Sequence, residues 1–458
     1  MPPRSRQGIR VSRLTAVLQS SHPARAVIYA FAFAVGIGTA LLMLPVAAAD
    51  GSVTDLRTAL FTSTSAVCVS GVAVVDTATH WSTFGQVVIL LGVQTGGFGI
   101  MTFASLLGLL VSRRLGLRTR LVAQAETNSL QLGDVNRVLR GVAVVSFTVE
   151  LLVAAMLTAR LWVGGGVSLG RAAWLGLFHA VSAFNNAGFA LWSDNLIRYV
   201  SDPWFCLPIA MAVIVGGLGF PVLFELGRGY RTPRRWSVHT KITLLGTTAL
   251  ISGGTVALLT LEWTNPGTLG PLDTPGKVLA GFFSSVMPRT AGFNSLDYGK
   301  MGEESLMVTD LLMFIGGGSA STAGGIKVTT FTILFFAILA EVRGDEVVEA
   351  FGRRVPAAAL RQALSVALLG VATVVAGTLA MLKMTNLGLD RVLFEVVSAF
   401  STAGLSTGIT PTLPPAAQNL LVALMFIGRV GTVTLASALA LRHRPRLYQL
   451  PEERPIIG

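Results

Sequence analysis

Long apolar runs constrain this chain more strongly than any other feature of its sequence. A helix needs about 20 apolar residues to cross the hydrocarbon core of a bilayer. Seven runs reach that length, at residues 26–46, 84–111, 141–161, 205–226, 242–261, 360–382 and 420–441. An eighth, 306–339, is long enough but is interrupted by glycines. Because only 13% of the residues are charged, against about 25% in soluble domains, the sequence predicts an all-α polytopic membrane protein with eight spans.

The positive charges indicate how the spans are oriented. Arginine and lysine gather in five clusters, at residues 4–25, 113–140, 228–241, 343–361 and 442–446, and pairs of apolar runs separate the clusters. Since basic loops stay on the cytoplasmic side, we expect both termini to be cytoplasmic. The net charge of +12 does not indicate nucleic-acid binding, because the basic residues lie at the ends of spans.

The chain also contains four copies of one pattern, at residues 56–76, 172–194, 276–297 and 390–410. Each copy has an apolar helical segment, a turn of small residues with one glycine, and a polar exit. Superposing the copies on that glycine also aligns an upstream phenylalanine; the aligned residues are Gly71, Gly188, Gly292 and Gly404, with Phe61, Phe178, Phe282 and Phe394. A Ser-Ala pair follows the phenylalanine in three copies, whereas the third copy has Val286-Met287.

This arrangement predicts four helix–pore loop–helix units around a central pore with pseudo-fourfold symmetry. Each short segment has about 10–12 helical residues, which cross only half a bilayer. Its return strand leaves backbone groups without helical partners, and a membrane tolerates such a strand only where it is buried or lines a wet cavity. Ordinary extracellular loops are the alternative, but they would not keep a common register. The predicted organisation is an N-terminal arm 1–24, repeats 25–120, 121–235, 236–345 and 346–445, and a C-terminal tail 446–458.

The four turns suit a dehydrated cation, because backbone carbonyls aimed at an axis can replace its water shell. Glycine takes the unusual dihedrals that this requires and adds no side chain to narrow the opening. The candidate filter residues are Cys68, Val69, Ser70 and Gly71; Asn185, Asn186, Ala187 and Gly188; Arg289, Thr290, Ala291 and Gly292; and Ser401, Thr402, Ala403 and Gly404. No Asp, Glu or His lies among them, so no metal-ligand cluster is expected there.

Three carboxylates lie just beyond the turns, at Asp76, Asp194 and Asp297. They would raise the cation concentration at an outer mouth. The alternative is that they are ordinary solvated loop residues.

Two further features lie within spans. Consecutive glycines cannot hold a stable helix, since each costs roughly 1 kcal/mol relative to alanine. The interrupted run contains Gly316, Gly317, Gly318, Ser319, Gly324 and Gly325, with Lys327 following. A small-residue packing face is the alternative interpretation of this run.

Arg429 is expensive to place in the middle of the last span, so it is either a functional residue or a structural cation held by loop carbonyls. Glu150, also within a span, has no assigned role.

The four turns are similar to the selectivity filters of the Trk/Ktr/HKT superfamily of potassium transporters, and the resemblance extends from about residue 24 to 441. In that family a glycine in all four filters accompanies potassium selectivity, and a serine in the first accompanies sodium preference. Gly71 therefore implies potassium, although Ser70 stands where the family usually has threonine. The resemblance also implies that the 316–325 run is an intramembrane gate loop, and that Arg429 lies under the filter and opposes cation leakage.

The short segment before the first span makes the chain most similar to the bacterial Ktr membrane subunit, the KtrB type. This implies a homodimer in a bacterial plasma membrane, paired with a cytosolic RCK-type, KtrA-like regulatory subunit that binds an adenine nucleotide. The largest cytosolic loop, around 112–140, is too short for a nucleotide-binding domain, so no cofactor is expected in this chain itself.

The expected function is selective potassium uptake, gated by the intramembrane loop and by the partner, with sodium dependence left open. A sodium-permeable or non-selective cation transporter of the same fold is the alternative. An enzyme is not expected, because the histidines are scattered and no paired-carboxylate, His-Cys or Ser-His arrangement is present; the histidines are His22, His80, His179, His239 and His443.

Overall fold

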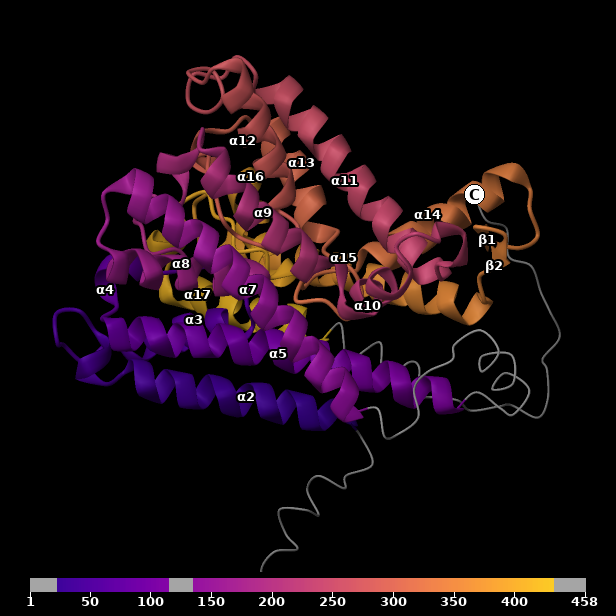
Figure 1. The fold of residues 1–458 in the computed structure, drawn as a ribbon, viewed down its shortest axis with the longest axis horizontal. Coiled ribbons are helices and arrows are strands. Elements are labelled where there is room, and N and C mark those ends of the chain that lie inside the picture. Colours follow the sequence, from indigo (N-terminus) through magenta and orange to yellow (C-terminus); the bar gives the residue numbers. More distant parts are fainter. Residues whose placement is uncertain (1–22, 115–134, 432–458) are drawn as a thin grey trace, which may run out of the picture.

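The computed structural model describes residues 23–114 and 135–431 (Figure 1). The expectations for most of the N-terminal arm 1–24, for the 446–458 tail and for the end of the last span lie outside the described residues. Apart from the helices that end at the glycine turns, the main helices are α2 (Pro23–Leu42), α5 (Thr83–Arg114), α7 (Val135–Gly165), α9 (Pro203–Leu218), α10 (Phe220–Gly229), α11 (Val238–Glu262), α13 (Glu303–Phe314), α14 (Val328–Arg343), α15 (Ala357–Met384) and α17 (Pro415–Phe426).

Four helices of 12 to 16 residues, called the short helices below, precede the four glycine turns: α3 (Leu56–Val67), α8 (Leu169–Phe184), α12 (Thr274–Val286) and α16 (Leu389–Ser401). The small elements are α4 (Thr77–His80), the 3-10 turns η1 (Pro45–Ala47), η3 (Ile197–Tyr199), η4 (Pro233–Arg235), η5 (Tyr298–Lys300) and η6 (Thr410–Thr412), the π-helical turn η7 (Ile427–Gly431), and the strands β1 (Glu349–Ala350) and β2 (Arg353–Arg354).

The helices follow one another in four groups, each with one of these four helices between two others: α2–α3–α5, α7–α8–α9, α11–α12–α13 and α15–α16–α17. Each group packs on the next, since α5 contacts α7 and α8, α9 contacts α11 and α12, and α13 contacts α16. Within the first group, α2 and α5 run side by side (Figure 1). Because α17 returns to contact α3, the four groups close into a circle.

Four helices of the described chain are each long and apolar enough to cross a membrane, namely α5, α7, α11 and α15. The other predicted spans are less regular. α2 and α17 are shorter apolar helices, and the predicted span at 306–339 is divided between α13 and α14. The predicted interruption of that span is therefore present, at residues 315–327.

The predicted span at 205–226 differs from expectation, because α9 and α10 meet at a bend of 100°. Gly219 forms the bend with a φ of +91°, and Pro221 in the first turn of α10 fixes the restart. The bend frees carbonyls near the end of α9, and the interrupted span uses them. The Gly318 N–H donates to the Gly217 carbonyl at 2.7 Å, and the Thr322 N–H donates to the Gly216 carbonyl at 3.3 Å. Two broken helices thus satisfy each other's backbone groups, as a membrane interior requires.

The 315–327 segment, called the central loop below, is also closed at its base. Ile315 and Ile326 form a bridge, in which the Gly316 N–H donates to the Ile326 carbonyl at 2.8 Å. The Phe220 N–H in turn donates to the Ala320 carbonyl at 3.2 Å. Backbone hydrogen bonds therefore hold the central loop at its base and against the start of α10.

A two-stranded hairpin departs from the all-helical expectation. β1 and β2 pair antiparallel, and Phe351 and Gly352 between them both have positive φ. The hairpin packs beside the start of α11, where Ala350 is buried in a cluster with Ile242 and Val355.

The bend at Gly219 provides a test of this architecture. An alanine there would take a left-handed conformation and would press its Cβ against the Ser319 carbonyl. We expect Gly219→Ala to lower the free energy of unfolding by about 2 kcal/mol or more, measured by thermal unfolding in detergent. Gly253→Ala is the matched control, because a Cβ at Gly253 within α11 meets nothing within 4 Å. Equal melting temperatures for both variants would contradict the role of the bend.

Candidate functional site

The candidate site is formed by the four turns that end the short helices, at residues 68–71, 185–188, 289–292 and 401–404, called the first to fourth turns. The second residue and the glycine of every turn have positive φ: 55° and 82° at Val69 and Gly71, 60° and 70° at Asn186 and Gly188, 69° and 74° at Thr290 and Gly292, and 52° and 85° at Thr402 and Gly404. The residue between them does not. A strand that alternates the sign of φ can turn successive carbonyls to one side, which is the geometry a backbone cation site needs.

The left-handed residues other than glycine were not foreseen from the sequence. Each costs about 1–3 kcal/mol and persists only where its surroundings enforce it. Val69, Thr290 and Thr402 are the most unusual, because β-branched residues rarely adopt positive φ. The non-glycine side chains of all four turns are at most 6% exposed. These side chains therefore pack into the protein, and the turns face one another with their backbones.

The Ser-Ala pairs noted in the sequence explain how three of the turns are built. The serine carbonyl accepts from the residue before the glycine, and the alanine carbonyl accepts from the left-handed residue, as in a helix-ending Schellman motif. In each bond the N–H of the first residue donates to the carbonyl of the second. In the first turn the bonds are Ser70 to Ser65 (2.7 Å) and Val69 to Ala66 (3.1 Å); in the second, Ala187 to Ser182 (2.7 Å) and Asn186 to Ala183 (3.1 Å); in the fourth, Ala403 to Ser398 (2.8 Å) and Thr402 to Ala399 (3.2 Å). The third turn, which lacks the pair and contains Pro288, bonds differently: the Ala291 N–H donates to the Met287 carbonyl at 2.9 Å.

The four glycines lie in a ring in chain order. An ideal Cβ on Gly188 would lie 2.6 Å from the Gly292 Cα, and one on Gly292 would lie 3.0 Å from the Gly404 Cα. A Cβ on Gly404 would meet the Ser70 carbonyl of the first turn, and one on Gly71 would meet the Ala187 carbonyl of the second. Each turn thus contacts the next at the point where a side chain is missing. We call this arrangement the glycine ring.

The central loop lies directly against three of the turns. The Thr322 hydroxyl donates to the Asn186 Oδ1 at 3.2 Å and to the Phe184 carbonyl at 3.3 Å. A Cβ on Gly324 would lie 2.7 Å from the Ser401 carbonyl of the fourth turn. On the third turn, Arg289 Nη2 donates to the Gly316 carbonyl at 3.2 Å.

Two cations, the buried Arg429 and the half-buried Lys327, bind carbonyls of the central loop. Arg429, 1% exposed in the π-helical turn η7, donates through Nη1 to the Thr322 carbonyl. Its Nε and Nη2 have no hydrogen-bond partner among the described residues. Lys327 donates through Nζ to the Ala323 and Gly324 carbonyls. The predicted gate residues therefore lie together beside the glycine ring.

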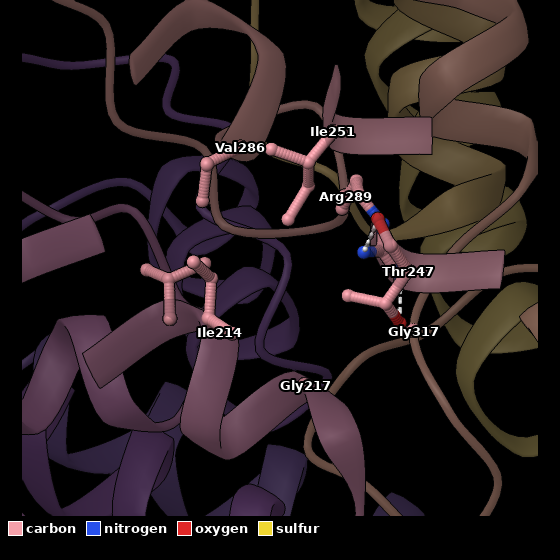
Figure 2. A pocket seen from close by; sticks show the side chains of 8 residues that line it. Ile214, Gly217, Thr247, Ile251, Val286, Arg289 and Gly317 are labelled. Atoms are coloured by element: carbon pink, nitrogen blue, oxygen red, sulfur yellow. Dashed lines mark hydrogen bonds between the residues drawn. The ribbon is translucent and has the colours of Figure 1, made fainter. Parts of the chain in front are cut away.

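The first residues of the third and second turns, Arg289 and Asn185, contact different neighbours. Arg289 reaches α11, where Nη2 lies 3.3 Å from the Thr247 hydroxyl (Figure 2). The same residues line a small cavity with Ile214 and Val286 (Figure 2). Asn185 instead donates to Gln94 at 2.9 Å. The sequence did not indicate that Gln94, Thr247 and Thr322 contact the turns. Only Gln94 carried a signal, because it is a polar residue inside an apolar run.

The three acidic residues predicted for an outer mouth have local partners. Asp76 accepts from the Ala78 N–H at 2.9 Å and caps α4. Asp194 forms an ion pair with Arg198 at 2.7 Å, and Asp297 forms one with Lys300 at 3.3 Å. Two of the three charges are therefore compensated, which weakens the field they can contribute outside. Within the described ranges, no group of three or more His, Cys, Asp and Glu side chains could hold a metal ion.

Comparison with known proteins identifies the class. The TrkH family, described as "Cation transport protein", matches residues 11–445, and this chain belongs to that family. It is a multi-pass membrane transport protein and not an enzyme, as the sequence predicts. The resemblance to the Trk/Ktr/HKT superfamily is likewise confirmed.

Particular relatives are similar over nearly the whole chain. "Ktr system potassium uptake protein B" of Bacillus subtilis is 41% identical over 418 residues, covering 91% of this chain and 93% of the relative. The protein of the same name from Vibrio alginolyticus is 38% identical, covering 91% of both chains. "Potassium/sodium uptake protein NtpJ" of Enterococcus hirae is 33% identical, covering 95% of this chain and 97% of the relative.

A solved structure shows the same fold. The crystal structure of the potassium transporter TrkH from Vibrio parahaemolyticus has a TM-score of 0.70 to this chain at 14% identity, covering 94% of this chain and 86% of that one.

The contact between the central loop and the second turn can be tested directly. Thr322→Val removes the hydroxyl that bonds Asn186 and Phe184 but keeps the side-chain volume. We expect backbone amides of the central loop to exchange with deuterium about tenfold faster, the equivalent of one lost hydrogen bond. Thr332→Val is the control, because that hydroxyl bonds only the Val328 carbonyl within its own helix. Unchanged exchange in the Thr322 variant would mean that the loop is held by other contacts.

Proposed function

We propose that this chain is the ion-translocating membrane subunit of a potassium-uptake system, and that potassium passes through the glycine ring. The observation that carries the proposal is the ring itself, in which four backbone turns approach one another with no side chain between them. Relatives named as potassium uptake proteins, at 41% and 38% identity over most of the chain, support potassium as the ion.

The proposed selectivity filter comprises the four turns, 68–71, 185–188, 289–292 and 401–404. Backbone carbonyls replace the hydration shell of the ion, and the partial negative charge at the C-terminal ends of α3, α8, α12 and α16 stabilises it. A membrane potential of about 100 mV contributes ~2.3 kcal/mol per charge, enough for roughly fifty-fold accumulation. Four helix–pore loop–helix units, with the boundaries expected from the sequence, arrange these turns with pseudo-fourfold symmetry.

Sodium permeation is the second candidate function. It is favoured by the relative named as a potassium/sodium uptake protein. Gly71 favours potassium. Sodium as an activator of potassium uptake is compatible with both.

We propose that the central loop is the gate. It contacts three turns, it carries Lys327, and Arg429 binds its Thr322 carbonyl. A positive charge held under the ring opposes a cation leaving it, so the loop and Arg429 must separate or shift for flux.

The proposed assembly is a homodimer in a bacterial plasma membrane, with a cytosolic RCK-type, KtrA-like partner that binds an adenine nucleotide. The names of the Ktr relatives, which speak of a system, support a partner. Both termini would be cytoplasmic. In support, two basic clusters lie at one end of the molecule, where Lys241 lies 5.8 Å from the Phe351 ring of the hairpin.

Growth of a potassium-uptake-deficient bacterium at low external potassium tests the proposal. The wild-type chain, expressed with a Ktr-type cytosolic partner, is expected to restore growth. Gly71→Ser and Gly292→Ser should abolish it or shift uptake toward sodium, because a side chain there meets the neighbouring turn. Gly170→Ala, where a Cβ meets nothing within 4 Å, is the control. Growth unaffected by both serine substitutions would remove the filter assignment.

The gate assignment makes a separate prediction. Arg429→Ala removes the charge and the bond to the Thr322 carbonyl, so rubidium uptake into vesicles should rise severalfold. The upper limit of the increase is set by the ~1.5–3 kcal/mol that a charged hydrogen bond contributes. Arg198→Ala, which breaks an exposed ion pair outside the ring, should leave uptake unchanged. Unchanged or lower uptake in the Arg429 variant would count against a gating role.

A further inference from the structure

A buried polar cluster lies behind the second turn and joins three helices. Glu150 on α7 accepts from Gln94 Nε2 of α5 at 3.1 Å and from Asn185 Nδ2, at the end of α8, at 3.2 Å. Gln94 Oε1 in turn accepts from the same Asn185 Nδ2 at 2.9 Å. Close packing makes this possible, because a Cβ on Gly97 would collide with the Asn185 side chain. The three side chains form a closed triangle that connects the first helix group to the second.

The charge of Glu150 is not compensated locally. The side chain is only 2% exposed, and no ion pair involves it in the part of the chain that the structure describes. Both neighbours are neutral amides that offer N–H donors, which suit an acceptor-only carboxylate. A buried carboxylate normally has a counter-charge, because an isolated one is expensive to bury.

Asn185 connects this carboxylate to the glycine ring. It is the first residue of the second turn and caps α8, and its side chain also donates to the Val181 carbonyl at 2.9 Å. The next residue, Asn186, has the left-handed φ of 60° and accepts from Thr322 of the central loop. Gly188 of the ring lies two residues further along. A shift of Asn185 therefore moves both the ring and its contact with the loop.

We propose that Glu150 is a positioning residue for ion binding: through Asn185 it holds the second turn in place, and its charge is balanced by the cation in the glycine ring. The inference rests on the proposed function and deepens it. It predicts that ion affinity depends on a residue that does not itself contact the ion, and that the four sides of the ring differ electrostatically.

The test is rubidium uptake, with its half-saturating concentration, in vesicles containing the full chain and its cytosolic partner. Glu150→Gln keeps the shape and removes the charge, and should raise the half-saturating concentration on the order of tenfold. Glu262→Gln is the matched control. Glu262 is also 2% exposed and without a basic partner among the described ion pairs, but it bonds Asn265, Thr268 and Gly302 away from the four turns. Its half-saturating concentration should equal that of the wild type.

The exchange Gln94→Glu with Glu150→Gln restores one carboxylate and one amide to the triangle, and should recover most of the affinity. A residue that only stabilised the fold would lower the melting temperature in Glu150→Gln without moving the half-saturating concentration. If Glu150→Gln does not fold, Asn185→Leu breaks the same link from the other end and should raise the half-saturating concentration in the same direction.

Wild-type values in every folded variant that breaks the link, beside active wild-type vesicles, would overturn this inference alone. Wild-type vesicles that take up no rubidium would overturn the proposed function and this inference with it.

Discussion

The missing Cβ atoms at four positions determine how closely the four turns can approach one another. Gly71, Gly188, Gly292 and Gly404 each face the backbone of the next turn, and an ideal Cβ would fall at or within 3 Å of it. The circle of helix groups is closed by the contact of α17 with α3, so a turn displaced by a side chain would displace its neighbours as well. The helices, the central loop and the buried charges are all arranged around this close approach.

Around the ring, backbone groups that lack helical partners are satisfied by other broken segments. α9 ends early at Gly219, and the central loop bonds to its freed carbonyls. In a membrane interior neither break would be stable alone, because water is not available to complete the bonds. The glycines at 216–219 and 316–318 serve this interlocking and allow two loops to approach at backbone distance.

The ring is fourfold in backbone and asymmetric in charge. Arg429 and Lys327 hold the central loop, Arg289 connects the third turn to it, and Glu150 lies behind the second turn. The side chains at the first position of each turn differ, and those of the second and third turns contact different neighbours. In the proposed filter, a cation would meet equivalent carbonyls but a field that varies around the axis, so affinity could be adjusted without altering the backbone of the turns.

The sequence by itself determined the membrane class, the four repeated units and the positions of the four glycines, because these depend on local hydropathy and on one residue type at fixed spacing. It also located the helix interruption after Phe314 and the unusual Arg429. The sequence also showed that the third copy lacks the Ser-Ala pair, and in the structure this turn bonds differently from the other three.

Only the tertiary structure decided which segments meet. Val69, Asn186, Thr290 and Thr402 have a left-handed φ, although residues other than glycine usually have a negative φ. The packing around them imposes this conformation. The 100° bend at Gly219 depends on the central loop, about 100 residues further along the chain. That loop donates hydrogen bonds to the carbonyls before the bend and accepts one from the N–H after it. The Gln94–Glu150–Asn185 triangle spans 91 residues, and no local pattern shows that three polar side chains from separate helices share one buried site. Such contacts follow from the closure of the ring, which a single sequence does not display.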